Sequence, residues 1–404
     1  MAQKLRVNHP LRGFFHRLAG ASLGLVLAAA LIAGLALSAP LPTAHIVAKR
    51  IGFVTATPLA FPPVSPSISY GVSVPALHLG YYPPSTPVSI ASITKLMTAY
   101  VALTQVDQSK QASTCHTVDD IDVAAYRHEV DTGQSTALIQ VGQSLCVPDL
   151  IRGLIVHSAS DYALILCRLF STSTVEFVSQ MNAMAKALGM SNTVYADPTG
   201  IEAGNKSVPR DQLVLTDKLM KFSLVRDAAK LPSIDLPVAG VLNSFTPYAG
   251  QYNVIGVKSG RTDAAGGCDV MATQMQFGGK SYLALVAVFG ARGGDLLKPA
   301  GDAALAVSEA IPTLIATHRF SPSETLGTIF WEGQKVHFTL AQTITSTTWK
   351  FKTSSSWRVH MRRINSALPA HSVVGWIIGA DGAVEASLVT TASLRAPSLW
   401  QRIL

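Results

Sequence analysis

Acidic residues are missing from the first quarter of the chain. The first 106 positions hold seven Lys and Arg and no Asp or Glu, residues 107–318 hold sixteen against twenty, and residues 319–404 hold nine against four. The formal excess of +8 therefore lies at the two ends. Excess positive charge can serve nucleic-acid binding, but no RNA-binding, zinc-finger or basic-helix pattern is present. A nucleic-acid partner is therefore not expected.

Cysteine is also scarce. The four residues of this type lie far apart, and no CxxC pair or histidine at ligand spacing accompanies them, which excludes a zinc site built on cysteine. In an oxidising compartment two of them could pair. Cys115 and Cys146 are the favoured couple because each lies in a short strand-like stretch; the alternative is two small buried apolar side chains.

An uninterrupted run of apolar and small residues covers positions 18–39. Its length is close to the roughly 20 residues that a membrane-spanning helix needs, and basic residues ahead of it would hold the N-terminus inside. The run predicts export to the periplasmic side of the cytoplasmic membrane. Ala36 and Ser38 suit a signal peptidase, so a cleaved signal and a retained anchor both stay open. The basic residues are Lys4, Arg6, Arg12 and Arg17.

Composition divides the chain into further parts. With 404 residues, 48% of them hydrophobic, the chain can bury more than one core. After the signal or anchor of residues 1–42, residues 43–66 are rich in Pro, Ala and Thr and are interpreted as a linker. Helical and strand patterns follow over residues 67–317, and short alternating segments fill residues 318–404.

The patterns over residues 67–317 predict an α/β (α+β) domain in which helices flank one antiparallel sheet. Its strand-like segments include NVIGVKSG, GCDVMATQMQF and SYLALVAVFG. Segments such as KVHFTL and SVVGWII after residue 318 predict a separate all-β sandwich. Helical periodicity covers residues 90–106, 149–170, 174–188 and 295–315.

Ser92 and Lys95 form a first candidate for chemistry. They lie three apart at a predicted helix start, so both side chains project from one face. A lysine there can accept the serine proton if burial or neighbouring cations lower its pKa. Alone this pattern is weak, because a serine-rich chain contains it by chance.

Ser158-Ala159-Ser160-Asp161 is a second candidate. It interrupts a long apolar helical region with a polar loop, and Asp161 could cap the helix that follows. The alternative is an ordinary helix cap without a catalytic role.

Lys258-Ser259-Gly260 is the third candidate, at the end of the strand NVIGV. A lysine and a hydroxyl on an edge strand, followed by a residue without Cβ, leave room for a ligand backbone to dock. The alternative is a plain strand end. The order and spacing of the three motifs favour the chemical interpretation.

Together these motifs resemble the S-x-x-K, S-x-N and K-T/S-G set of penicillin-binding proteins and serine β-lactamases. The resemblance is strongest to the low-molecular-mass D-alanyl-D-alanine carboxypeptidases and covers nearly everything after residue 67. It implies a β-lactamase/DD-peptidase-like domain followed by a β-rich domain, without a metal or organic cofactor. Further matching text is VGQSLCVPDLIRGLIVHSASDYAL, NTVYADPTGI, SVPRDQL and GVKSGRTDAAGG.

The resemblance also implies roles. Ser92 would be the acylated nucleophile, Lys95 its general base, and Ser158 a proton relay toward the leaving D-alanine. The substrates and inhibitors would be peptidoglycan pentapeptides ending in D-Ala-D-Ala and β-lactam antibiotics.

The remaining implied roles concern binding. Lys258, Ser259 and Gly260 would bind the terminal carboxylate, with Arg210 supplying further positive charge. The backbone N–H groups of Ser92 and Arg261 would form the oxyanion hole.

One residue departs from the family's pattern. Ser160 stands where the second motif normally has Asn, whose amide would contact the substrate's peptide group and the lysine, so activity or substrate choice could differ. The family's C-terminal amphipathic anchor is also not seen, which favours the N-terminal run as the contact with the cytoplasmic membrane.

Several functions stay open beside the carboxypeptidase. A DD-endopeptidase would cut cross-links, and a catalytically weak muropeptide-binding or scaffold protein is suggested by Ser160. A β-lactamase is disfavoured because no E-x-x-L-N element lies between the second and third motifs.

Overall fold

The computed structural model describes residues 41, 43–48, 61–62, 64–350, 358–378 and 384–396. It divides into two compact units: residues 57–316 with 349–351, here called the helix-rich unit, and residues 1–56, 317–348 and 352–404, here called the β unit. The predicted export segment, residues 18–39, lies outside the described residues. Within the described ranges no helix is both long enough and apolar enough to cross a membrane.

A five-stranded antiparallel sheet forms the centre of the helix-rich unit. Its strands, in spatial order, are β10 (Val254–Thr262), β11 (Gly266–Phe277), β12 (Lys280–Ala291), β2 (Ser69–Val74) and β3 (Leu79–Tyr81). β11 is buried along nearly its whole length, as expected for a strand that helices cover on both faces. β10 lies at the edge of the sheet, so one side of its backbone is open to a ligand.

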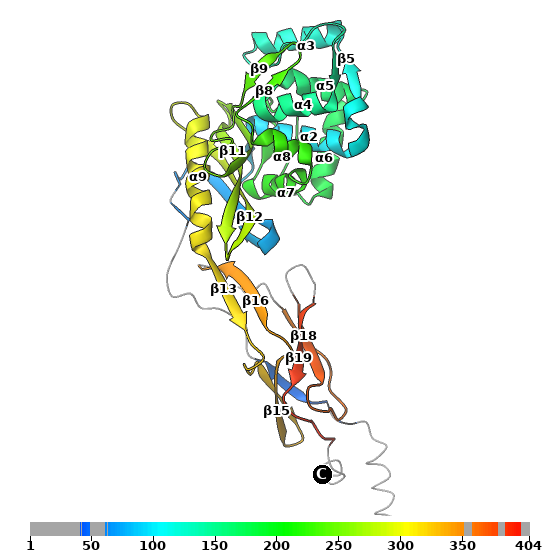
Figure 1. Ribbon diagram of the computed structural model, residues 1–404, viewed down its shortest axis with the longest axis vertical. Helices are drawn as coiled ribbons and strands as arrows, with labels where there is room; N and C mark the ends of the chain where they lie inside the picture. Colours follow the sequence, from blue (N-terminus) through cyan, green and yellow to red (C-terminus); the bar gives the residue numbers. More distant parts are fainter. Residues whose placement is uncertain are drawn as a thin grey trace, which may run out of the picture. The chain divides into compact units, whose positions relative to one another are not determined.

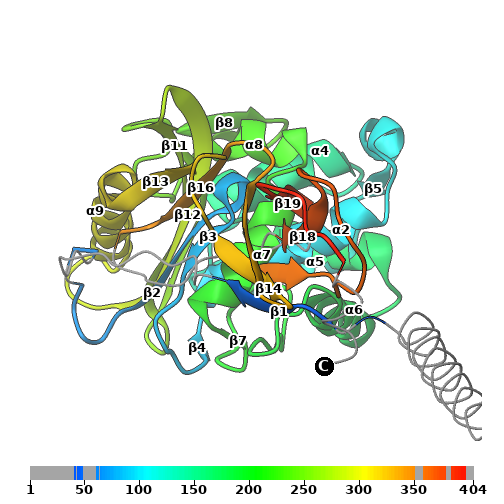
Figure 2. The same ribbon diagram turned by 90° about the horizontal axis from the view of Figure 1, so that it is seen from below.

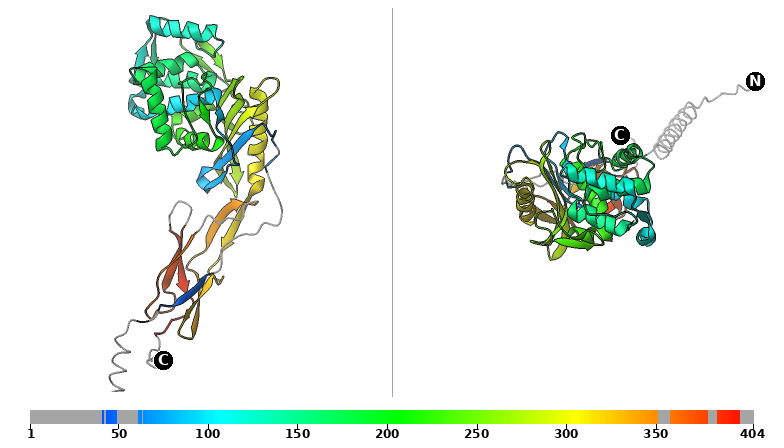
Figure 3. Two further views of the ribbon diagram at one scale, coloured as in Figure 1. Left: turned by 180° about the vertical axis from the view of Figure 1, so that it is seen from behind. Right: turned by 90° about the horizontal axis from the view of Figure 1, so that it is seen from above.

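Helices lie on both faces of this sheet. α9 (Leu297–Leu314) covers one face of β11 and β12. On the other face α7 (Pro209–Leu219) packs against β12 and β2, and α8 (Ser223–Ala229) packs against β10 (Figures 1 and 2). The further helices are α2 (Lys95–Thr104), α3 (Asp120–Asp131), α4 (Val147–Arg152), α5 (Ser160–Phe170) and α6 (Thr174–Ala187). They lie on the same side of the sheet as α7 and α8, away from α9 (Figures 1 and 3).

Short elements complete the helix-rich unit. A π-helical turn, η4 (Gly153–His157), joins α4 to α5, and the 3₁₀ turns are η1 (Pro75–Leu77), η2 (Ala91–Thr94) and η3 (Gln108–Ser113). Its small strand pairs are β4 (Val88–Ser89) with β7 (Lys206–Ser207), β5 (Cys115–Thr117) with β6 (Ser144–Cys146), and β8 (Ser233–Leu236) with β9 (Gly240–Asn243).

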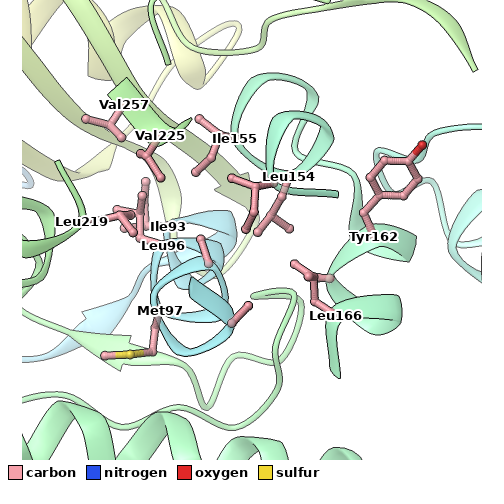
Figure 4. Packing of buried hydrophobic residues seen from close by; sticks show 14 of the residues in the cluster. Ile93, Leu96, Met97, Leu154, Ile155, Tyr162, Leu166, Leu219, Val225 and Val257 are labelled. Atoms are coloured by element: carbon pink, nitrogen blue, oxygen red, sulfur yellow. The ribbon is translucent and has the colours of Figure 1, made fainter. Parts of the chain in front are cut away.

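The larger hydrophobic core of this unit lies between the sheet and the helices on the side of α7 and α8. Leu96 and Met97 of α2 pack there with Leu154 and Ile155 of η4 and Leu166 of α5 (Figure 4). All five side chains are fully buried, so the helix that begins at Lys95 is held by its own apolar residues. Because each such side chain contributes about 1.5–3 kcal/mol on burial, this packing fixes the position of the neighbouring polar residues.

The β unit contains a six-stranded antiparallel sheet. In spatial order it runs β1 (His45–Ala48), β14 (Gly327–Trp331), β15 (Gln334–Leu340), β19 (Val384–Thr390), β18 (Val373–Ile378) and β17 (Arg358–Met361). β14 alternates buried and exposed residues, and Ile329, Trp331 and Phe338 lie in the core beneath the sheet. Two further strands, β13 (Ile315–Phe320) and β16 (Ile344–Trp349), pair with each other.

The predicted fold class is confirmed: helices flank an antiparallel sheet, and every described element after α9 is a strand. One strand was not expected. β1 lies inside residues 43–66, which the composition predicts to be a linker, and it pairs with β14. The favoured cysteine couple is also present, since Cys115 and Cys146 are joined by a disulfide where β5 meets β6.

Candidate active site

Ser92 and Lys95 meet at the start of α2. Ser92 lies in η2, and Lys95 begins the α-helix directly after it. The Lys95 Nζ donates to Ser92 Oγ at 3.1 Å and to the carbonyl of Thr199 at 2.7 Å. Since Lys95 is only 1% exposed, its amine is held by the protein rather than by water.

The backbone around Ser92 is tightly enclosed. Ala91, the preceding residue, has a φ of 47°, which is an uncommon conformation for a residue with a Cβ. A Cβ on Gly200 would lie 2.1 Å from the carbonyl oxygen of Ala91, and one on Gly260 would lie 2.6 Å from the Ser92 nitrogen. The third motif therefore approaches the backbone of Ser92 as closely as a glycine allows.

Burial shifts the protonation equilibrium of the Lys95 amine toward its neutral form. Burial lowers its pKa from 10.5 to about 8, although the charges of Asp197, Glu129 and Asp161 raise it in part. A neutral amine is therefore accessible near neutral pH, and it lies within hydrogen-bond reach of a hydroxyl.

Two buried carboxyl groups act on this lysine. Burial raises the pKa of Glu129, and it raises the pKa of Asp161 to about 7. Among the described residues, one oxygen of each, Glu129 Oε2 and Asp161 Oδ2, finds no hydrogen-bond partner. Asp161 does not cap α5 as predicted: Ala159 occupies the cap position, and Asp161 Oδ1 accepts from the Ala137 N–H at 3.1 Å. The Asp161 carboxyl instead links the segment around Ala137 to the start of α5.

Ser158 and Ser160 flank the turn between η4 and α5. Ser158 ends the π-helical turn with a φ of 62°, a left-handed conformation that is costly for a non-glycine residue. Ser160 is the first residue of α5 and is 1% exposed. Both line the cavity described below, as the sequence predicts.

The third motif lies within the edge strand β10 rather than at its end. Lys258 is fully buried, and its Nζ donates to the carbonyl of Ser259 at 2.6 Å. Burial and the charge of Lys95 lower the pKa of Lys258, while Asp269 raises it in part. Asp269, opposite Ser259 on β11, is itself fully buried, and burial raises its pKa.

One cavity of about 430 Å³ brings the three motifs together. Among the residues that line it none is acidic, so its polar wall consists of hydroxyls, amides, a histidine and an arginine. The cavity is lined by Ser92, Gly133, Gln134, Ser135, Thr136, His157, Ser158, Ser160, Phe245, Ser259, Gly260, Arg261 and Leu297.

Several lining residues were not predicted from the sequence. The ring of His157 lies 4.8 Å from that of Phe245, and its Nδ1 donates to the carbonyl of Asn243 at 2.8 Å. The Ser259 Oγ donates to the carbonyl of Phe245 at 2.8 Å. The sequence offered only one indication of these lining residues: His157 directly precedes the second motif.

Arg210 does not line the cavity. It lies in α7, where its guanidinium contacts the Asp211 carboxylate at 3.1 Å and the Gly189 carbonyl at 3.5 Å. Arg261, by contrast, lines the cavity and contacts Asp295 at 3.0 Å. In the described part of the chain no group of three or more His, Cys, Asp or Glu lies where it could hold a metal ion.

Comparison with known proteins agrees with this geometry. Residues 82–292, which contain all three motifs, match the family model of peptidase S11, described as D-alanyl-D-alanine carboxypeptidase. The chain belongs to this family. The chain is 29% identical to D-alanyl-D-alanine carboxypeptidase DacA of Escherichia coli over 44% of each protein. It is 30% identical to a D-alanyl-D-alanine endopeptidase of Pseudomonas aeruginosa, over 47% of this chain and 61% of that one.

Solved structures share the fold of this family member. D-alanyl-D-alanine carboxypeptidase DacD of Francisella tularensis matches 85% of this chain and 97% of its own, with a TM-score of 0.63 at 16% identity. The Streptomyces K15 DD-transpeptidase matches 62% of this chain and 98% of its own, with a TM-score of 0.55 at 24% identity. The chain spans less than half the length of the curated carboxypeptidases it matches.

Proposed function

We propose that this protein is a serine D-alanyl-D-alanine carboxypeptidase that removes the terminal D-alanine from peptidoglycan stem pentapeptides. The observation that carries the proposal is the contact between Ser92 Oγ and Lys95 Nζ, at 3.1 Å, beside a cavity that the other two motifs also line. Burial lowers the pKa of Lys95 to about 8, which supports its role as the base in this reaction.

The proposed reaction uses these positions. The Ser92 Oγ attacks the carbonyl carbon of the penultimate D-alanine, and its proton moves to the neutral Lys95 Nζ. The peptide C–N bond breaks, and D-alanine leaves as an amine that takes a proton by way of Ser158. Water then hydrolyses the ester on Ser92. A β-lactam would acylate the same oxygen through its strained amide.

The terminal carboxylate would bind at the β10 side of the cavity. Ser259 and Arg261 supply a hydroxyl and a guanidinium there, and Lys258 lies buried beneath them. The absence of acidic residues from the lining means that an anionic substrate meets no like charge at the wall.

D-alanine release from a purified pentapeptide tests the proposal. We expect release by the native protein, covalent labelling by a fluorescent penicillin, and loss of both in Ser92→Ala. Cleavage of a cross-linked dimer without release of D-alanine would assign an endopeptidase instead. Binding of pentapeptide without turnover or labelling would identify a muropeptide-binding protein and refute the enzyme.

We also infer that the protein acts on the periplasmic side of the cytoplasmic membrane. The apolar residues 18–39 and the Cys115–Cys146 disulfide both support export, because such bonds persist in oxidising compartments. N-terminal sequencing of protein from cells tests the manner of attachment: an intact N-terminus in the membrane fraction is expected. A start near residue 40 in the soluble periplasmic fraction would show a cleaved signal.

A further inference from the structure

Ser160 lines the cavity but offers no side-chain amide to a ligand. Its side chain ends in a hydroxyl, which offers one donor, whereas a side-chain amide offers two donors and a carbonyl acceptor. Of the described residues that line the cavity, Gln134 alone carries a side-chain amide. It reaches the wall from the segment between α3 and β6, not from the second motif itself.

Hydrogen bonds hold this segment against the start of α5. The Ser160 N–H donates to the Ser135 carbonyl at 2.8 Å, and the Ala137 N–H donates to Asp161 Oδ1 at 3.1 Å. On the other side, the Gln134 N–H donates to the Glu129 carbonyl at 2.8 Å. The backbone of Gln134 is therefore fixed relative to Ser160.

The amide of Gln134 is largely uncommitted. Its Nε2 donates to the Thr132 carbonyl at 3.3 Å, which is longer than an ordinary N–H···O bond. Among the described residues, neither the second N–H nor the Oε1 has a recorded protein partner, and the side chain is half-buried rather than fully exposed. An N–H donor and a carbonyl acceptor are thus available to a ligand in the cavity.

We propose that Gln134 binds the peptide group on the acyl side of the scissile bond and so supplies the amide that Ser160 lacks. The inference rests on the proposed function. A peptide group presents one N–H and one C=O, which a side-chain amide can pair in turn. The edge strand β10 bounds the cavity with Ser259 and Gly260 and offers its backbone to the substrate from there.

A double-mutant cycle tests the inference. Gln134→Met keeps the side-chain length and removes the amide, so we expect kcat/KM for D-alanine release to fall about three- to tenfold, the equivalent of one lost hydrogen bond. Ser160→Asn in the Gln134→Met background should restore kcat/KM to near the native value. Gln140→Ala, an exposed glutamine outside the cavity, is the matched control and should leave it unchanged.

A comparison of two penicillins shows whether Gln134 contacts the ligand or whether its replacement disturbs the whole site. Benzylpenicillin carries an acylamino side chain and 6-aminopenicillanic acid does not. Gln134→Met should slow acylation of Ser92 by benzylpenicillin severalfold and leave acylation by 6-aminopenicillanic acid unchanged. Equal losses with both compounds, no loss with either, or no rescue by Ser160→Asn would overturn the role of Gln134. If native Ser92 were not acylated at all, the proposed function would fail instead.

Discussion

The two fully buried lysines of the site have different surroundings. Lys95 is surrounded by three carboxyl groups and contacts Ser92, whereas Lys258 lies next to the charge of Lys95 and interacts with a single carboxyl, Asp269. Burial lowers the pKa of both amines. We expect a division of roles: Lys95 must release its proton to act, which burial favours, whereas Lys258 must keep its proton against the effect of burial to attract a carboxylate, and only the carboxyl of Asp269 opposes that effect.

Replacing each lysine by arginine should give the largest difference in activity between the two positions. Arginine keeps the charge but cannot be deprotonated in a protein. We expect Lys95→Arg to slow acylation of Ser92 by about 10²–10⁴, the usual contribution of a general base. Lys258→Arg should retain more activity. The measurement is the rate of labelling by a fluorescent penicillin, with thermal melting to confirm that each variant folds. Equal losses would overturn this division of roles.

The Lys95 side of the site also depends on a close backbone contact. In Gly200→Ala, the new Cβ would lie 2.1 Å from the Ala91 carbonyl oxygen and displace Ser92 from Lys95. We expect acylation to fall by about 10², since a shift near 1 Å can have that effect. Gly189→Ala is the control: its φ of 72° is also positive, but nothing lies within 4 Å of the new Cβ. A similar loss in both variants would assign the effect to backbone strain rather than to the displaced nucleophile.

The pH dependence of acylation reports on Lys95. In the proposed reaction the neutral amine is the base, and its fraction rises as pH passes through the pKa of about 8. The acylation rate should therefore fall about tenfold for each pH unit below that value and level off above it. Stopped-flow labelling over a pH series provides the profile. A rate independent of pH in this range would exclude Lys95 as the titrating base.

The charge of Glu129 should influence the pH midpoint of the acylation profile. Its negative charge raises the pKa of Lys95, so Glu129→Gln should move the midpoint to lower pH, by less than about one unit. At neutral pH the variant would then acylate slightly faster than the native protein. Glu309→Gln, at an exposed position of α9, is the matched control. A midpoint that stays in place, or that moves upward, would show that Glu129 carries no charge at the relevant pH.

Much of the site was predictable because its motifs are local. Ser92 and Lys95 lie one helical turn apart, and Ser158 and Lys258 stand at changes of pattern that mark a loop and a strand. Glu129, which acts on Lys95 from α3, could not be predicted. Its place beside the lysine depends on how α3 packs against α5, which no spacing in the sequence encodes.

Two placements that the sequence did not indicate have similar physical causes. Arg210 stands in a matching stretch of sequence, but its guanidinium pairs with the buried carboxylate of Asp211 next to it and lies outside the cavity lining. The strand β1 has only four residues, too few for a period of two to be recognised, and composition alone favours a linker there. Its strand character comes from β14, a partner distant in the sequence.

The pairing of β1 with β14 has a consequence for how the chain is made. His45 lies opposite Phe330, so the two strands are separated by roughly 280 residues of sequence, among the most non-local contacts that a chain of this length can form. β1 is synthesised early and must wait for a partner that follows the entire helix-rich unit. Completion of the six-stranded sheet is therefore a late folding event, and until then the edge of β14 is open to pairing with other chains.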